Sequence, residues 1–79
     1  MDWRERIVSD PDILMGKPCI KGTRLSVELI LGWLAQGWTH ETLLQSYPQL
    51  AREDILAALA FAADMMRDES YAVIDKAAA

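Results

Sequence analysis

Apolar residues recur at helical spacing from position 26 onward and predict a first helix there. Ser26 is the expected N-cap, because its hydroxyl can accept a hydrogen bond from a backbone N–H of the first turn. The spacing i, i+3, i+4, i+7 marks one helix face, made of Val27, Ile30, Leu31 and Leu34. Gly37 is a typical residue after a helix end and predicts that this helix stops near Gln36.

Two more helices are predicted after Gly37. Thr39 is the expected cap of a short second helix that Pro48 ends, and a third helix is expected from near Arg52 to about Asp68. Apolar positions of the third helix predict a broad buried face of Ile55, Leu56, Leu59, Ala62, Ala63 and Met66. The second and third helices have the proportions of a helix-turn-helix, although any compact three-helix domain contains such a pair.

The first 25 residues read as short extended pieces separated by turns. Extended segments are expected at residues 7–8, 13–15 and 18–20, with turns at 10–12, Gly16 and Gly22. Strands this short must pair with each other or with another chain. The predicted fold is mainly α: a three-helix, helix-turn-helix-like bundle (26–68) after a β element (1–25) that serves dimerisation. A tail or helix extension follows (69–79).

Composition favours an oligomer. A single domain of 79 residues is marginal as a monomer, yet 52% of its residues are hydrophobic. We expect a homodimer that uses the short strands and a second stripe on the first helix. The predicted interface residues are Ile7, Cys19, Ile20, Leu29, Trp33 and Trp38. The alternative is that a three-helix core of one chain wraps the surplus aromatic and aliphatic side chains.

The sequence predicts no catalysis. One Cys and one His exclude a disulfide framework and a His-rich metal site, and neither a nucleophile set nor a phosphate-binding glycine loop is evident. We therefore expect no enzyme activity, cofactor, metal or small-molecule substrate. The longest apolar run, residues 55–63, is shorter than the roughly 20 residues of a membrane span. The N-terminus has no apolar core typical of a signal peptide, so a cytoplasmic location without membrane contact is expected.

The net charge of −4 argues against indiscriminate nucleic-acid binding, but the basic residues cluster near the N-terminus. Lys17, Lys21 and Arg24 are candidate contacts to DNA phosphates, with Arg52 assisting from the third helix. The alternative is that these charges are solvated and protect an edge strand from aggregation. Arg24 is able to pair with a phosphate or with an internal carboxylate, and the sequence leaves both open.

The C-terminal tail contains three apolar residues in an otherwise polar and Ala-rich stretch: Tyr71, Val73 and Ile74. As an extension of the third helix, this segment is expected to dock a partner protein through an amphipathic face. The alternative is that it folds back onto the domain's own core.

Residues 6–68 carry a pattern beyond these local signals. Gly16-Lys17-Pro18 and Gly22-Thr23-Arg24 are its most specific blocks, followed by Pro48-Gln49-Leu50 and Glu53-Asp54-Ile55. In these blocks the chain resembles the small prokaryotic domain of unknown function 433 family. This resemblance implies a homeodomain-like, three-helix antitoxin of a toxin–antitoxin pair. Such a protein would bind promoter DNA as a transcriptional regulator and neutralise a PIN-like nuclease toxin.

One residue departs from the family pattern. The family tends to place Thr or Ser before the third helix, where this chain has Ala51. Ala is a poorer N-cap by about 1 kcal/mol and offers no hydroxyl for a phosphate. The competing function is therefore a non-catalytic protein-interaction and dimerisation module without a DNA role.

Overall fold

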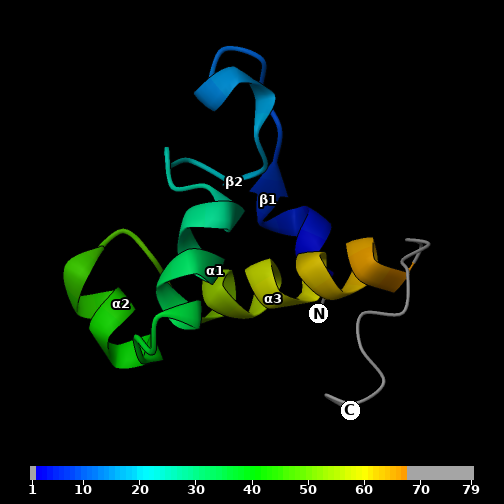
Figure 1. Ribbon diagram of the computed structural model, residues 1–79. Helices are drawn as coiled ribbons and strands as arrows, with labels where there is room; N and C mark the ends of the chain where they lie inside the picture. Colours follow the sequence, from blue (N-terminus) through cyan, green and yellow to red (C-terminus); the bar gives the residue numbers. More distant parts are fainter. Residues whose placement is uncertain (1, 68–79) are drawn as a thin grey trace.

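The computed structural model describes residues 2–67, and these form a mainly α domain with a small N-terminal sheet (Figure 1). This confirms the predicted fold class. Along the chain the elements are η1 (Trp3–Glu5), β1 (Ile7–Val8), η2 (Leu14–Gly16), β2 (Cys19–Ile20), α1 (Val27–Ala35), α2 (His40–Ser46) and α3 (Arg52–Arg67). The predicted partner-binding residues of the tail, Tyr71, Val73 and Ile74, lie outside the described residues.

The two short strands pair with each other within one chain. They are antiparallel, with Ile7 opposite Ile20 and Val8 opposite Cys19. The ladder continues beyond the strands, because the backbone N–H of Lys21 donates to the carbonyl of Arg6 over 2.8 Å. Of the two pairings expected for strands this short, the structure has the one within a single chain, which satisfies their backbone hydrogen-bonding groups.

Three residues predicted for the dimer interface lie in the core of the single chain. Ile7, Cys19 and Ile20 are 6%, 2% and 2% exposed, respectively. The hairpin lays these side chains against the helices, where burial removes their apolar surface from water. They offer little side-chain surface to a second copy, and their role at a dimer interface stays a prediction.

The loop between the strands also differs from expectation. Residues 13–15 were expected to be extended, but Leu14 and Met15 adopt left-handed backbone angles, with φ of 49° and 58°, inside η2. The turn is closed locally, because the backbone N–H groups of Asp12 and Ile13 donate to the side chain and carbonyl of Asp10. A third extended piece has no strand to pair with among residues 2–67, so local turn bonds prevail. The loop projects away from the helices (Figure 1).

The predicted helix ends are confirmed. The Ser26 hydroxyl accepts a hydrogen bond from the Leu29 backbone N–H over 3.0 Å, and the Thr39 hydroxyl accepts one from Thr42 over 3.1 Å. Gly37 follows α1 with a φ of 95°, the left-handed conformation that glycine adopts without strain.

The start of α3 replaces the missing cap in another way. Ala51 has no side-chain acceptor, but the Asp54 carboxylate reaches back and accepts from the Ala51 backbone N–H over 2.9 Å. This is one half of a capping box. The other oxygen of Asp54 accepts from Arg6 over 3.0 Å, so the same buried carboxylate ties the hairpin to α3.

Helix α3 is the longest helix of the described chain and packs on α1, α2 and η1. At its far end Trp3 donates its indole N–H to Asp64 over 2.6 Å and meets Phe61 edge-on. These contacts fix η1 against the C-terminal half of α3 (Figure 1).

The broad buried face predicted for α3 is wrong in part. Of the predicted residues, Ile55 is buried and Ala62 is half-buried. Leu56, Leu59 and Met66 are 43%, 41% and 56% exposed, and Ala63 is exposed too. The neighbouring elements within residues 2–67 cover one side of α3 only, so its second apolar side stays in contact with solvent.

Candidate macromolecule-binding surfaces

Basic side chains of the described chain divide into paired and unpaired groups. Five of the seven in residues 2–67 lie within 4.0 Å of a carboxylate. Lys21 and Arg24 have no such partner among the described residues, and both are exposed. We call these two residues, which flank the turn after β2, the hairpin cations. They are the described positive charges that lack a neutralising partner and so attract an anion best.

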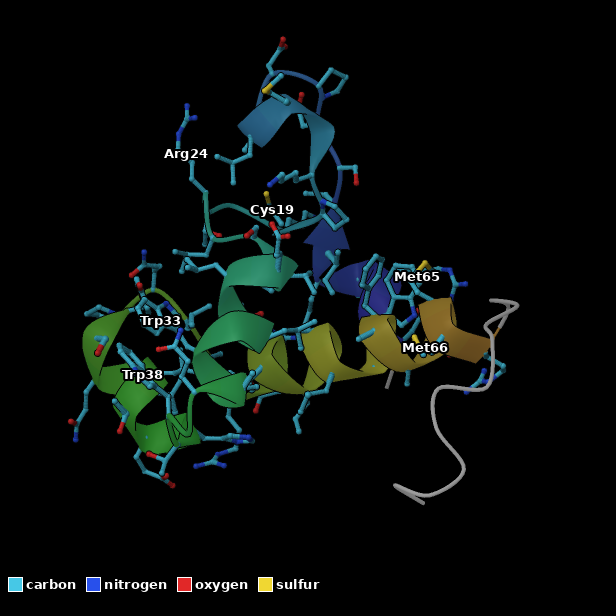
Figure 2. The ribbon with its side chains drawn as sticks, viewed as in Figure 1. Cys19, Arg24, Trp33, Trp38, Met65 and Met66 are labelled. Carbon is cyan, nitrogen blue, oxygen red and sulfur yellow. The ribbon has the colours of Figure 1, made fainter. Side chains whose placement is uncertain are left out.

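The turn between the hairpin cations explains the Gly22-Thr23-Arg24 block. Gly22 adopts a φ of 80°, and the Thr23 hydroxyl donates to the Ile20 carbonyl over 2.8 Å. The same hydroxyl accepts from the Leu25 backbone N–H over 3.0 Å. Gly22 and Thr23 thus build the turn, while Arg24 points away from the helices (Figure 2). Within residues 2–67, Arg24 meets no internal acid.

The other two predicted DNA contacts are ion-paired. Lys17 lies 3.0 Å from Glu28, and Arg52 lies 3.4 Å from Glu41 and 3.3 Å from the Nδ1 atom of His40. The pKa of Glu41 is lowered, first by the hydrogen bond to its own backbone N–H and then by Arg52. Glu41 therefore stays ionised and keeps Arg52 at the start of α2, apart from the turn that carries the hairpin cations.

The solvent side of α3, the second helix of the helix-turn-helix pair, is largely apolar beyond its first turn. Helices α2 and α3 are joined by a short turn, and Arg52 and Glu53 are exposed at the start of α3. Beyond them the solvent side of α3 presents Leu56 and Leu59. Base edges are read mainly by hydrogen-bonding side chains, so this apolar side favours contact with protein over contact with base pairs.

The tryptophans predicted for a dimer surface stack on each other. The rings of Trp33 and Trp38 lie 4.2 Å apart at an angle of 25°. Both are half-buried against the core, and Figure 2 shows them between α1 and α2. Leu29 on α1 is also half-buried against the core. One chain thus wraps much of this surface itself, which is the arrangement expected under the alternative to a dimer interface.

A shallow groove that the sequence did not reveal runs beside α1. Its volume is about 350 Å³, and it is lined by Lys17, Pro18, Ser26, Val27, Glu28, Leu31 and Phe61. Its lining comes from the strand region, α1 and α3, so no sequence window shows it. The groove is mainly apolar and brings together no acid–base or nucleophilic set.

The groups that would be needed for other chemistry lie apart. Cys19 is buried, with its Sγ–H directed to the Lys17 carbonyl over 3.1 Å. In residues 2–67 no group of three or more His, Cys, Asp or Glu is placed to hold a metal ion. No helix of the same residues has the length and apolar character needed to cross a membrane.

The hairpin, the three helices and the Gly-Thr-Arg turn together define a small helical domain of a recurring type. Residues 7–62 match the family model described as "Protein of unknown function (DUF433)", and the chain belongs to this family. This confirms the resemblance seen in the sequence.

Two related proteins support the assignment. A DUF433 member protein from Anabaena variabilis ATCC 29413 has a similar crystal structure. Its TM-score is 0.74 at 29% identity, over 78% of this chain and 61% of that one. The "Uncharacterized protein y4eO" of Sinorhizobium fredii (strain NBRC 101917 / NGR234) is 39% identical over 59 residues. That match covers 75% of this chain but 27% of the relative, so this chain spans about a quarter of that protein's length.

Proposed function

We propose that the chain is a non-catalytic, antitoxin-like regulator that binds promoter DNA and a PIN-like nuclease toxin. The resemblance to antitoxins of the family suggests both partners. The observation that carries the DNA half is the pair of hairpin cations, Lys21 and Arg24, which lack a carboxylate partner among residues 2–67. In this proposal the hairpin, and not α3, contacts the phosphates.

The hairpin cations suit this role because their backbone is held. Lys21 donates its backbone N–H to Arg6, and Arg24 follows the Thr23 turn that is bonded to β2 and to Leu25. A fixed backbone reduces the ordering cost of binding. The contacts would set the position of the protein on DNA by charge, with little direct reading of sequence.

DNA binding is tested with a fragment that contains the gene's own upstream region. Fluorescence anisotropy should show that the double variant Lys21→Ala/Arg24→Ala binds at least about tenfold more weakly, because each neutralised phosphate releases counterions. The control is Arg4→Ala/Arg52→Ala, which changes net charge equally at two ion-paired residues. The control should bind as the parent does. If both variants lose binding equally, the hairpin assignment is wrong.

A second candidate function is a protein-interaction module with no DNA role. The exposed apolar side of α3 favours it, since contiguous apolar surface commonly marks a protein contact. The same experiment separates the two functions. If the parent protein does not bind the DNA fragment even at low salt, the DNA-binding function is excluded and the protein-interaction module remains. The toxin half is tested by co-expression with an adjacent PIN-like gene, where a stable complex is expected.

A further inference from the structure

The solvent side of α3 carries an apolar stripe that no element of residues 2–67 covers. It consists of Leu56, Leu59, Ala63 and Met66, which we call the α3 stripe. Leu56, Leu59 and Met66 are 43%, 41% and 56% exposed, and Ala63 is exposed between them. On a helix that turns about 100° per residue, these four positions fall within an arc of about 80°.

The spacing of the stripe is that of a coiled-coil seam. Its residues are three, four and three positions apart, the alternation of the a and d positions of a heptad. The chain's own core uses other sides of the helix, through Ile55, Ala57 and Ala58. Met65 is also 43% exposed but lies off the stripe, and Figure 2 shows Met65 and Met66 on different sides of α3.

We propose that the α3 stripe binds the same stripe of a second copy of this chain, with the two helices antiparallel. The register that places Leu59 opposite Ala63 of the second copy also places Leu56 opposite Met66. Each Leu59 near the centre then faces the small Ala63 of the other copy, so the two helix axes can approach closely. Each leucine side chain packs into a space between residues of the facing helix. The two-fold symmetry makes every contact occur twice.

Charges beside the stripe select the second copy and its direction. Glu53 and Arg67 lie on the same edge of the stripe, at e positions of the heptad. Antiparallel coiled helices bring e positions together, so each Glu53 meets Arg67 of the other copy. A parallel pair would set Arg67 beside the uncharged g position Ala62 and would give Glu53 no g partner within α3. The antiparallel pair is therefore the complementary one.

Within residues 2–67, Glu53 and Arg67 make only exposed or long ion-pair contacts. Glu53 lies 4.0 Å from Arg6, and Arg67 pairs with Asp64 over 2.9 Å at the surface. Exposed ion pairs of this kind contribute little to stability, so both side chains are available for exchange. Because the stripe is short and the interface small, we expect a weak dimer with a dissociation constant on the order of 10 µM.

Sedimentation equilibrium of the full chain tests the surface. Leu59→Gln should weaken the dimer about tenfold or more, because it places a polar group at the centre of the seam. Met65→Gln is the matched control, with the same helix and nearly the same exposure, and should leave the dimer unchanged. Circular dichroism checks that both variants fold. A parent chain that remains monomeric, or a dimer that survives Leu59→Gln, overturns the proposal.

Charge exchange tests the antiparallel register. Glu53→Arg and Arg67→Glu should each weaken self-association, since each puts like charges together twice. An equimolar mixture of the two variants should dimerise as the parent does, because both contacts become complementary again. Failure of the mixture to associate overturns this register. The assay contains no DNA or toxin, so its outcome is separate from that of the proposed function.

Discussion

The carboxylate of Asp54 is the contact on which the junction of hairpin and helices depends. It is 7% exposed, accepts from Arg6 over 3.0 Å, and accepts from the Ala51 backbone N–H over 2.9 Å. Asp54→Ala removes both bonds at once. It leaves the Ala51 N–H without its capping partner and leaves Arg6 with its more distant contact to Glu53.

The cost follows from the two lost bonds. Loss of a helix-capping carboxylate costs about 1 kcal/mol. The hydrogen bond from Arg6 to Asp54 is charge-assisted, but Arg6 is 39% exposed and solvent screens the interaction. Losing this bond should therefore lower the free energy of unfolding by about 1 to 2 kcal/mol. We therefore expect Asp54→Ala to lower the free energy of unfolding by about 2 to 3 kcal/mol. A domain of this size has roughly 4 to 12 kcal/mol in total, so the variant should remain folded in water.

Urea unfolding followed by far-ultraviolet circular dichroism measures this cost at one fixed protein concentration. Asp54→Asn keeps an oxygen for the Ala51 N–H and should lose only the Arg6 part, about 1 to 2 kcal/mol. Glu53→Ala, next to it but exposed, should change stability by less than about 0.5 kcal/mol. A double-mutant cycle with Arg6→Met should give a coupling of about 1 kcal/mol.

Either of two results would show that Asp54 does not link the hairpin to α3 in this way. If Asp54→Ala lowers the free energy of unfolding no more than Glu53→Ala does, the carboxylate does not join the hairpin to α3. Alternatively, the effects of Asp54→Ala and Arg6→Met add without coupling, in which case the Arg6 bond contributes nothing.

Two further predictions concern one ion pair at the start of α2 and two glycines in and after α1. The folded-state pKa of Glu41 is lowered, so its stabilising effect is present above the unfolded pKa and is lost as pH falls through the folded value. The stability difference between the parent and Glu41→Gln should thus be present at pH 7 and vanish in acid. A difference that grows on acidification contradicts this. Gly32→Ala, in the open middle of α1, should stabilise by about 0.5 to 1 kcal/mol, whereas Gly37→Ala, at a φ of 95°, should destabilise by about 1 kcal/mol. Thermal unfolding of both glycine variants checks the opposite signs.

The features that the sequence predicted well are local. The caps at Ser26 and Thr39 and the helix end at Gly37 depend on residues three or four positions away. A short window of sequence contains all the atoms that decide them. The Gly22-Thr23 turn belongs to the same class, since its hydrogen bonds reach no farther than three residues.

Side-chain contacts between residues far apart in the chain could not be predicted from the sequence in this way. The bond between Asp54 and Arg6 could not be predicted from a short window of sequence, because the two residues are 48 positions apart. One signal was present: an acidic residue at the third helical position after a cap that lacks a side-chain acceptor. The pairing of Lys17 with Glu28 likewise needed the strand to be placed beside α1 before it could be seen.

The wrong prediction that the second apolar side of α3 is buried has a different cause. Periodicity shows which residues share a helix face, but it does not show how many neighbours surround the helix. Leu56 and Leu59 were assigned to the core because their spacing fits Ile55 and Met66. Within residues 2–67 the neighbours of α3 are η1, α1 and α2, and they cover the other side. An apolar stripe outside that core indicates a binding surface for a partner. Only the packed structure distinguishes the residues of such a stripe from those of the core.

The two proposed surfaces lie on different elements, which makes a joint measurement informative. The α3 stripe joins two copies without using the hairpin, so a dimer presents Lys21 and Arg24 twice and keeps them accessible to DNA. Each neutralised phosphate contributes about −0.9 to the slope of log affinity against log salt concentration. A dimer with four hairpin cations should give a slope near −3.6, and a monomer with two should give about −1.8. Leu59→Gln should therefore halve the salt slope while leaving both cations in place. An unchanged slope would mean that DNA is contacted by one copy alone.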